Sequence, residues 1–183
     1  MRHKYATQAI VLARRPLAES AALVTLLTEE FGIVRARAEG LRKPGAKLAH
    51  ALQTFDACEV TLVRGKEGWR LSGALQGESW FRNLSRSARV RAGRVNGLLI
   101  RLVHGELNDV FLFPLFSQFL EDLTRLTEEE QDTAEILTAL RILAVLGLDA
   151  GAVPEDSTYA PLSAEDRRAL VTRVNHGISA SGL

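Results

Sequence analysis

Five short apolar runs, separated by turns that contain glycine, proline or charge, fill the first 80 residues of this 183-residue chain. In the clearest run, residues 33–38, apolar side chains alternate with Arg35 and Arg37, so one face is apolar and the other is cationic. The other runs are residues 9–13, 22–28, 58–63 and 69–76. Runs of this length and spacing predict five β-strands with at most one short helical turn, near residues 46–52, between them.

Five strands with tight turns predict a closed or nearly closed barrel, and the OB-fold is the natural five-stranded candidate. The runs at 9–13 and 22–28 are almost continuously apolar, so we expect both strands to be buried on two faces. Cys58 alternates with Val60 and Leu62 and is interpreted as a small core residue, not a nucleophile. In the fifth strand, Trp69, Leu71, Gly73 and Leu75 are expected to share one face.

From about Asn83 the apolar period becomes helical. Thr127 followed by Glu130 predicts a capping box, and Ser163 before two acidic residues predicts the start of a last helix. The expected fold class is therefore α+β, a five-stranded OB-fold barrel followed by an all-α helical domain. The expected domains are residues 1–80, an OB-fold domain, and residues 81–183, a helical domain.

The small net charge of +1 hides a large asymmetry. Residues 1–94 hold 17 Lys and Arg against 8 Asp and Glu, whereas residues 95–183 hold 6 against 14. A basic half favours a functional surface for a polyanion, although two surfaces of opposite charge that dock on each other would give the same pattern.

The chain shows no enzyme signature. Its four histidines are scattered without metal-ligand spacing, its single cysteine excludes an internal disulfide, and no glycine-rich phosphate loop is present. We therefore expect no catalytic residues, no cofactor and no metal. The basic N-terminus is not followed by a continuous apolar segment, and no apolar run is long enough to span a membrane, so a cytoplasmic protein is expected.

The basic residues of the first half form the candidate nucleic-acid site, because they cluster at strand ends and in one loop. The candidates are Arg14, Arg15, Arg35, Arg37, Arg42, Lys43, Lys47, Arg82, Arg86 and Arg89. The last three have helical spacing and are expected to continue the positive stripe onto the first helix, in the direction of Arg94. Nearby aromatic side chains offer base stacking, although core packing is the more common use of each. They are Tyr5, Phe31, Phe55, Trp69 and Trp80.

Several segments together resemble the bacterial RecO family of recombination mediators. They include residues 9–12, 26–32 (LLTEEFG), 38–44 (AEGLRKP), 52–55 and 63–65 in the first half, and 113–116 and 143–148 in the second. The resemblance covers most of the chain and is most specific in residues 9–65. It implies an OB-fold followed by a helical domain, and it places the family's basic surface on Arg14, Arg15, Arg35, Arg37, Arg42, Lys43 and Lys47.

The resemblance also implies binding of single- and double-stranded DNA and annealing of complementary strands. It implies that the protein acts with RecR, and often RecF, to load RecA onto DNA coated by single-strand-binding protein. The family also binds the acidic tail of single-strand-binding protein. An apolar slot flanked by Arg or Lys is therefore expected among the helices. Many members carry a four-cysteine zinc module after the Leu-Gly, but here residues 149–162 contain no cysteine. The alternatives are a protein-interaction adaptor without DNA affinity and an RNA-binding OB protein.

Overall fold

The computed structural model describes residues 3–17, 21–39, 51–105, 111–154 and 159–182. The chain divides into two compact units. The first comprises residues 1–83 and 103–113, and the second comprises residues 84–102 and 114–183.

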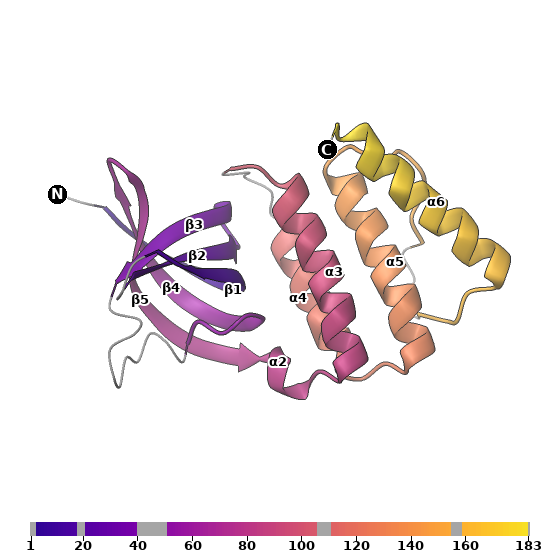
Figure 1. The fold of residues 1–183 in the computed structure, drawn as a ribbon, viewed down its shortest axis with the longest axis horizontal. Coiled ribbons are helices and arrows are strands. Elements are labelled where there is room, and N and C mark those ends of the chain that lie inside the picture. Colours follow the sequence, from indigo (N-terminus) through magenta and orange to yellow (C-terminus); the bar gives the residue numbers. More distant parts are fainter. Residues whose placement is uncertain (1–2, 18–20, 40–50, 106–110, 155–158, 183) are drawn as a thin grey trace. The chain divides into compact units, whose positions relative to one another are not determined.

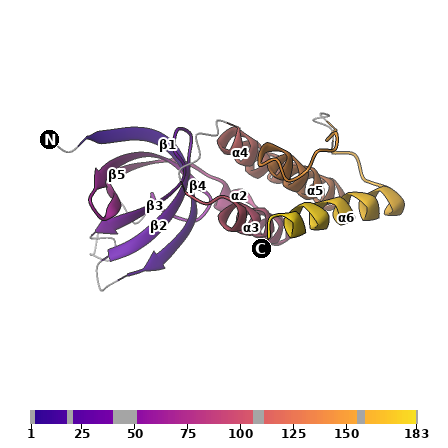
Figure 2. The ribbon, with the colours of Figure 1, turned by 90° about the horizontal axis from the view of Figure 1, so that it is seen from above.

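The first unit contains a closed five-stranded barrel with the strand order β1-β2-β3-β5-β4 (Figures 1 and 2). Its strands are β1 (Lys4–Pro16), β2 (Ala21–Thr28), β3 (Gly32–Glu39), β4 (Asp56–Gly65) and β5 (Gly68–Ser79). All neighbours are antiparallel except β3 and β5, which pair in parallel. The five-stranded barrel and the helices that follow it confirm the α+β, OB-fold class.

Small and branched side chains fill the barrel interior, because every second residue of each strand points inward. Cys58 belongs to this core, and burial, with the nearby Asp56 charge, raises the pKa of its thiol to about 12. It is a core residue, as expected. β1 is buried on both faces, since Ile10 and Leu12 on its other face are no more than 1% exposed.

A β-bulge makes one expectation about β5 wrong. Leu62 pairs with Leu71, but Thr61 pairs with Gly73, so Ser72 is an extra residue in β5. The alternation changes phase at that point. As a result Ala74 packs against the core, whereas Leu75, expected to share the face of Trp69 and Leu71, is 68% exposed.

The helices are α2 (Trp80–Asn83), α3 (Arg86–Leu102), α4 (Leu112–Leu123), α5 (Glu128–Val145) and α6 (Ala164–Ala180). In the second unit α5 packs against α3 on one side and α6 on the other (Figure 1). The expected capping box is present, because Thr127 accepts from the Glu130 N–H while the Glu130 carboxylate accepts from the Thr127 N–H. Ser163 caps α6 through the Asp166 N–H, as expected.

The segment between α5 and α6 is tied down by side chains of both helices. Arg173 on α6 donates two hydrogen bonds to Asp149, 2.9 and 2.5 Å long, and a third to the Ala152 carbonyl. Thr133 on α5 donates to the carbonyl of Ala160, and the buried Tyr159 donates to Asp122. No helix in the described ranges is long and apolar enough to cross a membrane.

Candidate nucleic-acid interface

Arg35 and Arg37 lie on the outer face of the barrel, as the alternation in β3 predicts. Both are exposed, and the residues between and beside them are buried in the core. The backbone of β3 is fixed by pairing along its whole length with β2, where Arg35 lies opposite Thr25 and Arg37 opposite Leu23. The two guanidinium groups are therefore presented from a rigid strand.

The register of the barrel aligns further cations with Arg37. Arg15 lies opposite Leu23, Leu23 opposite Arg37, and Arg37 beside Arg70. On its other side Arg70 pairs with Val63 of β4, and Val63 in turn pairs with Lys4 of β1. Directly paired residues point to the same side of a sheet, so Arg15, Arg37, Arg70 and Lys4 form one line of outward, exposed cations, here called the basic row.

Sequence reasoning missed Arg70 and Lys4. The alternation in residues 69–71 places Arg70 on the outer face, but its position beside Arg37 depends on the parallel pairing of β3 with β5, which are not consecutive strands. Such a pairing is not visible in local periodicity. The strand order of the OB-fold, which pairs β3 with β5, is the signal that places Arg70 beside Arg37.

Arg14 points to the face opposite that of Arg15. A bulge at Leu12 shifts the register, so Arg14 lies opposite Val24, a core residue, while Arg15 lies opposite the outward Leu23. Arg14 is exposed because it lies near the end of β1. Of this predicted pair, only Arg15 shares a face with Arg35 and Arg37.

The aromatic side chains near this surface pack on one another. Tyr5, Phe31 and Trp69 have ring centroids 5.4 to 5.6 Å apart, and all three contact the barrel core. The guanidinium of Arg64 lies 5.1 Å from the centre of the Trp69 ring. Phe55 and Trp80 are 4% and 5% exposed. Phe55, Trp69 and Trp80 are therefore core residues, whereas Tyr5 and Phe31 are partly buried against the core.

The predicted stripe of Arg82, Arg86 and Arg89 on one helix is wrong. Arg82 lies in α2, which ends at Asn83, and Arg86 begins α3. The break is stabilised by Ser85, whose hydroxyl accepts from the Ala88 N–H at the start of α3. Arg86 and Arg89 remain neighbours on α3. Arg42, Lys43 and Lys47 lie outside the described residues.

Few carboxylates oppose the cations on the barrel. Arg37 donates from Nε to Glu39, at 2.7 Å, with both side chains about half exposed. Within the described ranges no ion pair involves Arg15, Arg35, Arg70 or Lys4. An exposed pair such as Arg37–Glu39 is worth little in water, so it does not prevent Arg37 from binding another anion.

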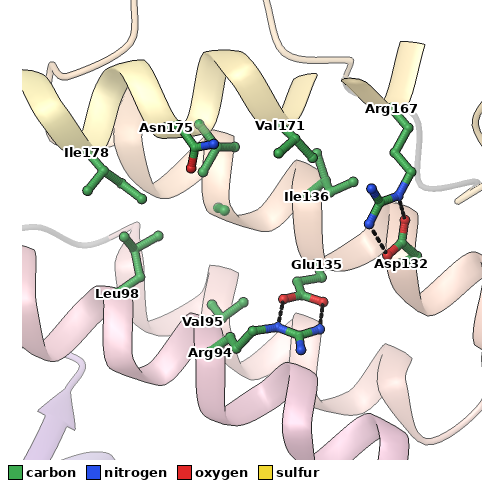
Figure 3. Close-up of a pocket in the computed structure, with 12 residues that line it drawn as sticks. Arg94, Val95, Leu98, Asp132, Glu135, Ile136, Arg167, Val171, Asn175 and Ile178 are labelled. Carbon is green, nitrogen blue, oxygen red and sulfur yellow. Dashed lines mark hydrogen bonds and ion pairs between the residues drawn. The ribbon is translucent and has the colours of Figure 1, made fainter. Parts of the chain in front are cut away.

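The helical unit carries an apolar groove flanked by two arginines. The groove, of about 440 Å³, is lined by half-buried or buried apolar side chains of α3, α5 and α6, with Arg94 and Arg167 at its edge (Figure 3). The apolar lining is Val95, Leu98, Ile136, Ala139, Val171, Val174 and Ile178. The groove is the candidate for the slot that the resemblance implies, and Asp132, Glu135 and Asn175 also line it.

Both arginines at the groove are ion-paired with α5. Arg94 contacts Glu135, with one hydrogen bond of 2.6 Å from Nη2, and Arg167 donates two hydrogen bonds to Asp132 at 2.7 and 3.1 Å (Figure 3). Arg91 bridges Asp132 and Glu135. The hydrogen bonds from Arg167 and Arg91 hold the pKa of Asp132 below its usual value despite partial burial. Arg94 is thus part of a neutralised network and not of a positive stripe.

No group of three or more His, Cys, Asp or Glu side chains suited to a metal ion occurs among the residues that the structure describes. The fold and its charged face define an OB-fold protein whose barrel exposes arginine and lysine on its outer surface and is followed by a helical unit.

Residues 1–78 match the family model described as Recombination protein O N terminal. Over 167 residues the chain is 30% identical to the DNA repair protein RecO of Gloeobacter violaceus, covering 88% of this chain and 62% of that relative. It is 29% identical to the proteins of the same name from Acidovorax ebreus, over 89% of this chain and 65% of the relative, and Dehalococcoides mccartyi, over 70% and 51%. The chain is thus similar to RecO proteins over most of its own length, and it spans between about half and two thirds of the lengths of these relatives.

Proposed function

We propose that this protein acts in DNA repair and recombination by binding the phosphate backbone of single- and double-stranded DNA on the outer face of its barrel. The observation that carries the proposal is the set of exposed cations on rigid strands, Arg35 together with the basic row. The similarity to RecO proteins supports it, since the relatives are named as DNA repair proteins. Each phosphate that these cations neutralise releases counterions, which drives binding without sequence preference.

Strand annealing follows from contacts that reach phosphates and leave bases free. Because Tyr5, Phe31 and Trp69 pack together against the barrel core, these three rings offer little of their faces for base stacking. A strand held through its phosphates keeps its base edges available for pairing. Neutralised phosphates also repel a second strand less. No covalent chemistry is required for this step.

The test is the affinity for a labelled oligonucleotide measured against salt concentration. We expect Arg35→Glu to weaken binding and to reduce the slope of log K against log salt by at least roughly 0.7, the value for one phosphate of a single strand. The matched control is Arg168→Glu, which makes the same charge change at an exposed position of α6. Equal effects of the two variants, or no effect of either, would contradict a site on β3.

The annealing step has its own measurement. Mixing complementary oligonucleotides, one carrying a fluorophore and the other a quencher, gives the annealing rate. We expect the wild-type protein and Arg168→Glu to accelerate annealing, and Arg35→Glu to lose most of that acceleration. Acceleration that survives Arg35→Glu undiminished would assign annealing to another surface.

The groove of the helical unit supports a second role, the docking of a protein partner. We propose the C-terminal tail of single-strand-binding protein as the occupant of this apolar channel. Apolar side chains of the tail would fill the groove, and its carboxylates would compete with Glu135 and Asp132 for Arg94 and Arg167. Binding there would bring the barrel to coated DNA, where cooperation with RecR and RecF in loading RecA would follow. DNA binding would also place the protein on the nucleoid.

A further inference from the structure

Arg37 and Arg70 form an unusual pair on the barrel surface. They are direct neighbours across the parallel β3–β5 pairing and both point outward. Adjacent strands lie ~4.8 Å apart, so the two side chains leave the sheet side by side. Like charges placed directly opposite each other destabilise a sheet. An anion between the two guanidinium groups would remove that cost.

A carboxylate of the chain itself, that of Glu39, already contacts one of the two arginines. Glu39 lies two residues beyond Arg37 on the same face of β3, and its carboxylate accepts a 2.7 Å hydrogen bond from Arg37 Nε. A carboxylate oxygen in this position occupies a donor that a phosphate oxygen would otherwise use. Arg70 has no ion pair with any described residue, so the pair of arginines keeps a net positive charge.

Arg70 also borders a hollow at the turn between β4 and β5. Its lining is Arg64, Lys66, Arg70, Glu67 and the two glycines Gly65 and Gly68, and its volume is about 570 Å³. Three cations against one carboxylate make this hollow positive. It extends the cationic surface from Arg37 and Arg70 to the turn, and it gives a polyanion room beyond a single contact.

We propose that Arg37 and Arg70 together hold one phosphate of the DNA backbone, and that Glu39 is an internal competitor which that phosphate displaces from Arg37. The proposal rests on the proposed function and refines it. Competition by the Glu39 carboxylate would make the barrel bind DNA more weakly than it would without that charge. A limit of this kind suits a protein that must release strands after they pair.

The decisive variant is Glu39→Gln, which removes the competing charge and keeps the shape of the side chain. Its matched control is Glu59→Gln, which makes the same charge change at an exposed, outward position of β4 that has no ion pair with a described residue. The probe is a labelled poly-dT oligonucleotide. Because an exposed ion pair is worth up to about 1 kcal/mol, we expect Glu39→Gln to tighten binding by about two- to fivefold and Glu59→Gln to have a smaller effect.

Two further variants test the mechanism. Arg70→Ala should weaken binding and lower the salt slope by about 0.7, because one phosphate contact is lost. In an Arg37→Ala background the gain from Glu39→Gln should fall to that of Glu59→Gln, because the carboxylate then has no arginine to occupy.

Equal gains from Glu39→Gln and Glu59→Gln would overturn the proposal, as would an unchanged gain in the Arg37→Ala background. Neither result would affect the proposed function, which fails if Arg35→Glu binds DNA as the wild type does or weakens binding no more than Arg168→Glu. Circular dichroism of each variant checks that the barrel is folded.

Discussion

Arg173 holds Asp149 and Ala152, two described residues of the connection between α5 and α6. Its guanidinium makes two hydrogen bonds to Asp149, whose side chain is 8% exposed, and a third to the Ala152 carbonyl. These hydrogen bonds hold the pKa of Asp149 below its usual value. A bidentate arginine–carboxylate pair fixes both position and orientation. It therefore fastens the start of the α5–α6 connection to α6.

We predict that Asp149→Asn lowers the free energy of unfolding of the helical unit by about 1–2 kcal/mol at pH 7. A carboxyl group whose pKa is lowered by folding stabilises the protein above its unfolded pKa of ~3.9 and loses that effect as the pH falls through the folded value. The difference between wild type and variant should thus be constant near neutrality and shrink below about pH 4. Urea unfolding followed by ellipticity at 222 nm measures it.

The exposed Glu78→Gln is the control for that experiment, since it removes a carboxylate that has no ion pair with a described residue. Its stability should follow that of the wild type at every pH. If Asp149→Asn were as stable as the wild type at pH 7, the Arg173 contacts would not contribute to holding the segment.

At the scale of elements, local signals in the sequence predicted most of the fold. Continuous apolar runs identified the first two strands and alternation identified the other three, while the Thr127 and Ser163 caps marked the starts of α5 and α6. The errors come from interactions that periodicity does not contain. The bulge at Ser72 exposes Leu75, and the break after Asn83 separates Arg82 from Arg86. Likewise, Arg70 joins the site only through pairing of strands distant in the sequence.

The packing of α6 on α5 depends on a glycine. A Cβ atom added at Gly177 would lie 2.9 Å from Leu143 Cδ1 and 3.2 Å from the Leu148 carbonyl oxygen. Leu143 is fully buried, so neither neighbour can move freely. At Gly97 on α3, an added Cβ would meet nothing within 4 Å. These two helical glycines therefore have opposite roles.

We predict that Gly177→Ala lowers the free energy of unfolding by about 1–2 kcal/mol, because overpacking outweighs the gain in helix propensity. Gly97→Ala should raise it by about 0.5–1 kcal/mol through that propensity alone. Thermal and urea unfolding of both variants measure the two effects. A Gly177→Ala variant that is more stable than the wild type would show that α6 can move away from α5 at little cost.

Across the whole molecule, charge and apolar surface are divided between the two units. Exposed, largely unopposed cations lie on the barrel, whereas the helical unit neutralises Arg91, Arg94 and Arg167 with Asp132 and Glu135 beside an apolar groove. A surface dominated by charge suits a polyanion and is sensitive to salt. A groove dominated by apolar side chains suits a peptide and is less sensitive to salt. The chain thus offers two chemically different binding surfaces.

If the two surfaces act independently, variants on each should affect one ligand only. Val174→Asp places a charge in the groove and should abolish binding of a fluorescent peptide with the C-terminal sequence of single-strand-binding protein, while affinity for the DNA oligonucleotide stays within twofold of the wild type. Arg35→Glu should do the reverse. Fluorescence anisotropy with each labelled ligand, in the same buffer, measures both. Loss of peptide binding in Arg35→Glu would show that the peptide uses the barrel, and the adaptor role would then share the DNA surface.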